Sequence, residues 1–158
     1  MKALRALLAG IVGALAMSAA MFLIRELGEN ISLEVLLGST LTGVTSLPPW
    51  LSGFILHLVI GGLMGLVYAI TFEIVESSGP MTGGGLGLAH GLIAGLFMSS
   101  ITAMNPLSLG FSSPGPFLTH MSFGPAIFLV VHFIYGVTVG LVYGRPLHRP
   151  QLRPRHIV

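Results

Sequence analysis

The sequence contains no cysteine and very little charge. Without thiols, the chain can form no disulfide, no thiol redox pair and no cysteine-ligated metal site. Only 8% of its 158 residues are charged, whereas soluble domains carry about 25%. Apolar residues make up 53% of the chain and the mean hydropathy is +0.92. The composition therefore predicts an integral membrane protein.

Four long runs contain no Asp, Glu, Lys or Arg: residues 6–24, 51–72, 83–104 and 121–143. About 20 apolar residues are enough to cross the hydrocarbon core as a helix. Backbone groups in lipid must also find their hydrogen-bond partners within the same segment, and a helix satisfies this condition. The predicted fold is an all-α membrane protein with four transmembrane helices.

The basic residues predict how the chain is oriented. Lys2 and Arg5 precede the first run, four arginines lie in a basic tail at 145–158, and only Arg25 lies elsewhere. Lys and Arg are retained on the cytoplasmic side, so both termini are expected there. Because topology accounts for these charges, we expect them to meet the headgroups of the lipid bilayer and not nucleic acid.

The second and fourth runs share a motif, H-x-x-x-G-x-x-x-G-L-V-Y, which begins at His57 and recurs 75 residues later at His132. The first and third runs align more weakly at an offset of 81, which matches Gly10 with Gly91. We interpret the chain as one four-helix domain built from two tandem helical hairpins, a first repeat at 1–76 and a second at 83–146. Two spans per unit make the copies parallel, as in parallel-repeat transporters.

Glycines four residues apart predict close helix contacts. In lipid, helices associate through van der Waals packing, and small residues let their backbones approach. The packing glycines predicted from the repeat are Gly61, Gly65, Gly136 and Gly140. Outside the spans, Asn30 is expected to cap a short helix through about Leu41 at the outer interface.

Ionisable residues inside a membrane are functional candidates. The repeat places His57 and His132 at equal depth in two parallel helices, as bis-histidine ligation of haem b requires. The glycine four residues after each histidine would leave room for a porphyrin edge. Contact with a quinone or pigment is an alternative, and so is simple hydrogen bonding between helices. His90 matches Ala9 in the 81-residue alignment, and we interpret it as an interfacial residue.

Other chemical signals are weak. Tyr68 and Tyr143 end the two motifs and are typical of the aromatic belt at a membrane surface. The sequence contains no catalytic constellation and no metal-binding motif, so an enzyme is not expected. No carboxylate lies within the four runs, which is unusual for ion-coupled transport.

The segment from Leu4 to Val12, and the stretch from His132 through Gly144, resemble a family of small prokaryotic four-span membrane proteins of unknown function. This resemblance implies a four-helix fold in the prokaryotic inner (cytoplasmic) membrane, and it brings no activity or catalytic residues.

Three functions remain open. The preferred hypothesis is a non-catalytic accessory subunit, without a cofactor, that binds other membrane subunits of a respiratory or photosynthetic electron-transfer complex. Its basis is the small extramembrane mass and the absence of catalytic groups. The alternatives are a protein that binds haem b or a quinone through His57 and His132, and a transporter of small solutes or lipids.

Overall fold

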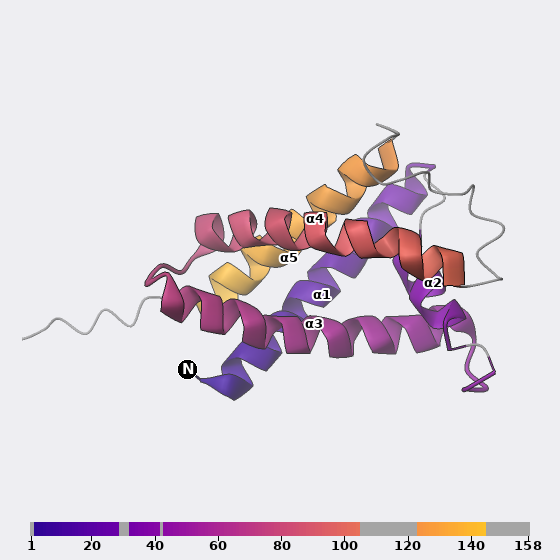
Figure 1. Cartoon of the computed structure of the whole chain (residues 1–158), viewed down its shortest axis with the longest axis horizontal. Helices are drawn as coiled ribbons and strands as arrows, with labels where there is room; N and C mark the ends of the chain where they lie inside the picture. The colour runs from indigo at the N-terminus through magenta and orange to yellow at the C-terminus, as the bar shows by residue number, and fades with distance from the viewer. Residues whose placement is uncertain (1, 29–31, 42, 105–122, 145–158) are drawn as a thin grey trace, which may run out of the picture.

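The computed structural model describes residues 2–28, 32–41, 43–104 and 123–144. In these ranges the chain forms helices only (Figure 1): α1 (Ala3–Glu26), α2 (Leu33–Ser39), α3 (Pro49–Ile74), α4 (Pro80–Met104) and α5 (Phe123–Tyr143). The all-helical fold class is thereby confirmed. The predicted basic tail at 145–158 lies outside the described residues, as does Asn30.

Proline and glycine set several helix boundaries. Pro49 is the first residue of α3, where the missing N–H would have no partner in any case. Pro80 opens α4 directly after Gly79, whose φ of +121° is a conformation that other residues rarely adopt. The sharp turn between α3 and α4 follows from this pair.

Among the described residues, three helices are long and apolar enough to cross a membrane: α1, α3 and the 125–143 part of α5. The fourth predicted span coincides with α4, which has 25 residues. A membrane protein is thus supported, while the count of four spans and the cytoplasmic location of the termini stay predictions.

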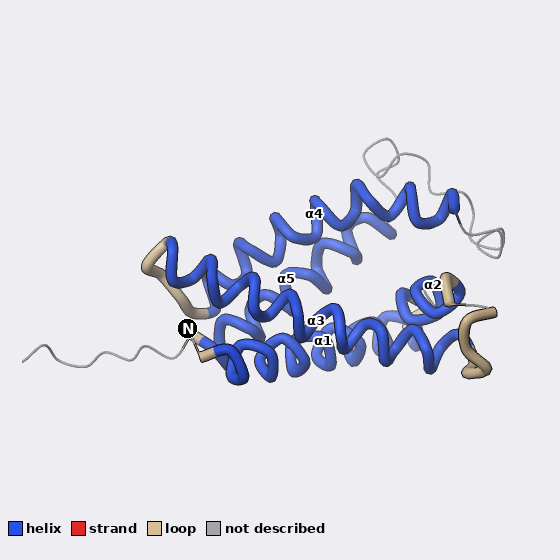
Figure 2. The backbone as a smooth tube through the Cα atoms, turned by 60° about the horizontal axis from the view of Figure 1, so that its bottom comes forward, coloured by secondary structure: helices blue, strands red, loops and turns tan. Residues whose placement is uncertain are grey.

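The long helices form two pairs, α1 with α3 and α4 with α5 (Figure 2). The pairs are joined mainly where α1 packs against α5. At the N-terminal end, the Arg5 guanidinium donates to the Val142 carbonyl at 2.9 Å and ties the start of α1 to the end of α5. Towards the other end, where α2 packs on α3, the two pairs diverge (Figure 2).

Small residues lie where the paired helices cross. A Cβ added at Gly10 of α1 would collide with the Gly61 carbonyl and with Gly65 of α3. A Cβ added at Gly83 of α4 would collide in the same way with the Gly136 carbonyl of α5. All four glycines proposed for packing lie at such crossings: Gly61, Gly65, Gly136 and Gly140.

These contacts relate the two pairs by a register that differs from the sequence alignment. Gly10 is equivalent to Gly83, 73 positions later, and not to Gly91, 81 positions later. The difference is eight residues, about two helical turns. Because small residues recur every four positions on both helices, sequence comparison accepts either register. In the structural register, Ser18 of α1 corresponds to Gly91 of α4.

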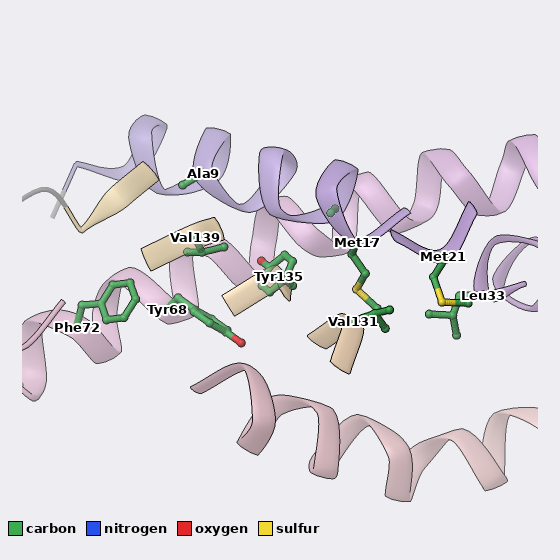
Figure 3. Packing of buried hydrophobic residues seen from close by; sticks show 10 residues of the cluster. Ala9, Met17, Met21, Leu33, Tyr68, Phe72, Val131, Tyr135 and Val139 are labelled. Atoms are coloured by element: carbon green, nitrogen blue, oxygen red, sulfur yellow. The ribbon is translucent and has the colours of Figure 1, made fainter. Parts of the chain in front are cut away.

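The buried core lies along the contact of α1 with α3 and α5 (Figure 3). Met17 and Met21 of α1 pack near Val131 and Leu33 towards the α2 end, while Tyr135 lies in the centre. Methionine suits such irregular gaps because its side chain is flexible.

Candidate functional site

A cavity of about 220 Å³ lies where the helix pairs diverge, and all five helices contribute to its wall. Its polar lining comes from three histidines and one tyrosine, and the remaining lining is apolar. The polar lining residues are His57, His90, His132 and Tyr135. We call this space the histidine cavity. It combines apolar walls with a few convergent polar groups, as small-molecule sites do.

His57 of α3 is held by α1. Its side chain is buried, and its Nδ1 atom lies 3.1 Å from the Ser18 hydroxyl. This is one of the interhelical partners expected for a histidine in a bundle. The bond fixes the ring through one nitrogen, so the other nitrogen, Nε2, is the atom available to the cavity.

His132 of α5 is held by its own helix. Its Nδ1 atom lies 2.7 Å from the Phe128 carbonyl oxygen. A carbonyl oxygen can only accept, so Nδ1 carries the proton. In the neutral ring Nε2 then bears the lone pair and acts as an acceptor. Gly91, the counterpart of Ser18, leaves space for the Cβ of His132 and offers it no hydroxyl.

His90 lies in the same cavity, contrary to the interfacial position expected from sequence. Its ring centroid is 4.9 Å from that of His132, and its Nδ1 atom is 3.4 Å from the Tyr68 hydroxyl. The 73-residue register explains the error, because it matches His90 with the buried Met17 and not with Ala9. Tyr68 is likewise buried, at 3% exposure, and is not a belt residue.

Tyr135 is the functional candidate that sequence reasoning missed. Its ring is 2% exposed and its hydroxyl donates to the Gly61 carbonyl at 2.6 Å, which joins α5 to α3. Its ring also packs edge-on against Tyr68, with centroids 5.4 Å apart. A tyrosine in the middle of an apolar span was the available signal, since a buried hydroxyl there needs a partner.

The space beside the histidines bears on the haem hypothesis. The space beside Gly61 is filled by Ala14 and Tyr135, and the space beside Gly136 is filled by Gly83 and Gly87. These glycines therefore serve helix contacts and leave no porphyrin slot at these positions. Within the described ranges, no three His, Asp or Glu side chains gather closely enough to hold a metal ion.

A charged pair lies next to the site. Glu34 is buried on α2, and its carboxylate is 3.0 Å from the Arg25 guanidinium of α1. The cap of α2 is Ser32, whose hydroxyl accepts from the Val35 N–H, so this helix begins later than the Asn30 cap predicted. Gly38 and Gly53 let α2 lie directly on α3, and this contact buries Glu34.

The pKa of Glu34 reflects opposing causes. Burial acts to raise the pKa, but its own backbone N–H, the Ser18 hydroxyl and the Arg25 charge outweigh burial and hold the pKa below its usual value. Glu34 is therefore ionised at neutral pH, with Arg25 as its counter-ion.

These features define the class of protein: in the described residues, an all-helical protein with helices long and apolar enough to cross a membrane and a cavity lined by histidines between them. Comparison with family models, with curated proteins and with solved structures finds no match to this chain.

Proposed function

We propose that the histidine cavity binds the head group of a lipid-soluble ring compound that carries carbonyl or hydroxyl oxygens, such as a quinone. The observation that carries this proposal is the convergence of three imidazoles on one apolar cavity inside the helix bundle. We also propose four spans with both termini cytoplasmic, which would put the α2 end of the bundle on the outer side.

The hydrogen-bonding groups suit an oxygen ligand. His132 offers an acceptor at Nε2, because its Nδ1 proton is used by the Phe128 carbonyl. Nε2 of His57 offers either a donor or an acceptor, because the Ser18 hydroxyl can adapt to either tautomer. A quinone carbonyl needs a donor and a quinol hydroxyl needs an acceptor, and this pair supplies both.

A ligand could also enter the histidine cavity from the lipid. Ile60 of α3 and Phe97 of α4 line the cavity and are exposed on the outside of the bundle. The cavity therefore opens between α3 and α4 onto the surface that would face lipid. A ligand with an apolar tail could leave that tail in the membrane.

The volume favours a small ring over haem. Sites for drug-sized ligands enclose about 300–1,000 Å³, and the histidine cavity encloses about 220 Å³. A single ring head group is in keeping with that size. The accessory-subunit and transporter hypotheses stay predictions, since they concern partner subunits and cargo that one chain does not contain.

The test is binding of short-tailed benzoquinones and naphthoquinones to the purified protein in mild detergent, read by isothermal titration. Ala94 lines the cavity, and Ala94→Leu should weaken binding by filling it. Ala89 lies on the same helix but is exposed, so Ala89→Leu is the matched control and should bind as the unaltered chain does. Equal affinities in the two variants would remove the cavity from consideration.

The same preparation separates the alternatives. A Soret band that is lost in the double variant His57→Ala, His132→Ala would restore the haem hypothesis. Stoichiometric oxidoreductase subunits found by mass spectrometry after purification from the native membrane would support the accessory-subunit hypothesis. A colourless chain that binds quinone and carries no other subunit supports the present proposal.

A further inference from the structure

A second cavity, of about 380 Å³, lies beside the histidine cavity and shares none of its lining residues. Its wall is formed by α1, α3 and the Ser32–Glu34 region at the start of α2. Unlike the histidine cavity, it contains a full ion pair, that of Arg25 and Glu34. We call it the polar cavity. It lies at the α2 end of the bundle, near the exposed Trp50.

Ser18 connects the two cavities. Its side chain lines the polar cavity and lies close enough to Glu34 to lower the pKa of that carboxyl. The same hydroxyl is 3.1 Å from Nδ1 of His57, whose ring lines the histidine cavity. A serine hydroxyl can donate one proton while it accepts another. It is therefore a link across the wall that separates the two cavities.

We propose that Glu34, Ser18 and His57 form a proton pathway from the ligand in the histidine cavity to the polar cavity. This inference rests on the proposed function for its ligand, but the pathway itself is a property of the three side chains. The His57 imidazole lies at the ligand end of this pathway, and the ionised Glu34 carboxylate lies at the polar-cavity end as the proton acceptor.

The transfer conserves charge. A quinol hydroxyl in the histidine cavity gives its proton to Nε2 of His57, while the Nδ1–H of His57 gives its proton to the Ser18 oxygen. Ser18 gives its own proton to the ionised Glu34 carboxylate, directly or through one water, and Glu34 releases it to water in the polar cavity. One proton enters and one leaves, and His57 regains its first tautomer by later proton exchange with water. General acid–base groups in hydrogen-bond reach are suited to this transfer.

Other titratable groups lie on the helices packed around His57. Arg25 is engaged with Glu34, and Tyr68 is engaged with His90. Besides His57, the titratable groups that line the two cavities are Arg25 on α1, Glu34 on α2, His90 on α4, and His132 and Tyr135 on α5, and Tyr68 on α3 contacts His90.

The second half of the chain lacks this link. Gly91 stands where the first half has Ser18, and His132 is bonded to a carbonyl of its own helix. A carbonyl carries no proton that it could pass on. The two histidines of the repeat therefore differ: His57 exchanges protons along the pathway, and His132 is held as a fixed acceptor. This difference provides an internal control.

The experiment measures proton exchange between water and each histidine ring by NMR of ¹⁵N-histidine-labelled protein in lipid bicelles. General acid–base transfer contributes on the order of 10²–10⁴-fold, so Ser18→Ala should slow exchange at His57 by at least about tenfold. Exchange at His132 should stay unchanged. Ser18→Thr keeps the hydroxyl and should restore most of the rate, and Glu34→Gln should slow exchange at His57 as Ser18→Ala does.

Ser52→Ala is the matched control, because Ser52 is also buried but bonds only to carbonyls at the start of its own helix. Unchanged exchange at His57 in Ser18→Ala, or equal slowing in Ser52→Ala, would overturn the pathway. Quinone titration on the same samples separates the two proposals. Exchange that depends on Ser18 in a chain that binds no quinone would retain the pathway and reject the ligand.

Discussion

The crossing of α4 and α5 can be tested by adding one methyl group at either of two glycines on the same helix. A Cβ at Gly83 would meet the Gly136 carbonyl and lie 3.1 Å from the Cα of Gly140, and these backbone atoms cannot rotate away. A Cβ at Gly85, two residues on, would meet nothing within 4 Å. Gly83→Ala and Gly85→Ala therefore differ only in the contact they create.

The expected difference in the free energy of unfolding between the two variants follows from that contact. Replacing glycine by alanine inside a helix gains roughly 0.5–1 kcal/mol, and this gain is common to both variants. Forcing an extra methyl group into a closely packed contact typically costs about 1–3 kcal/mol. The free energy of unfolding of Gly83→Ala should therefore lie about 1–3 kcal/mol below that of Gly85→Ala.

The assay is unfolding in mixed micelles with rising SDS fraction, followed by the near-ultraviolet circular dichroism of the buried tyrosines. Helical content persists in SDS, so a tertiary signal is needed. If both variants unfolded at the same SDS fraction, α4 and α5 would not cross at Gly83 and the 73-residue register would lose its basis.

Three further predictions concern the α2 end of the bundle and the tyrosine that joins α5 to α3. Tyr135→Phe removes the bond to the Gly61 carbonyl and should lower the free energy of unfolding by about 0.5–1.5 kcal/mol in the same assay. Gly53→Ala places a methyl group against the backbone of α2, so hydrogen exchange should become faster at 33–39 while α5 stays protected. Because its own backbone N–H, the Ser18 hydroxyl and Arg25 hold the pKa of Glu34 below 4.5, its stabilisation is complete above that pH and lost as pH falls through the lower folded value. The SDS midpoint should therefore drop on acidification in the unaltered chain and change less in Glu34→Gln. An equal pH dependence of the SDS midpoint in the two chains would contradict this reasoning.

Chain composition and periodicity predicted the helices well for a physical reason. Long apolar runs in lipid must satisfy their backbone groups internally, so a run such as 51–72 becomes a helix whatever its neighbours are. The structure places α3 at Pro49–Ile74, within two residues of that run at either end. The 75-residue repeat likewise brought attention to His57 and His132, both of which line one cavity.

Contacts between helices were harder to predict from the sequence. Small residues every four positions on α1 and α4 permit several registers, and only the packed structure selects the one that pairs Gly10 with Gly83. That register puts His90 in the cavity. It also provides a serine partner, Ser18, for His57 but not for His132. Sequence spacing fixes which residues share a helix face, but not which face of another helix they meet.

The amino-acid sequence by itself thus determined the helices, their membrane character and the two matched histidines, because these depend on hydropathy and on order along the chain. Tertiary structure alone decided that α2 is buried, that Glu34 pairs with Arg25, and that Tyr135 reaches Gly61. Each of these contacts joins residues on different elements, and their free energy exists only after the helices have packed.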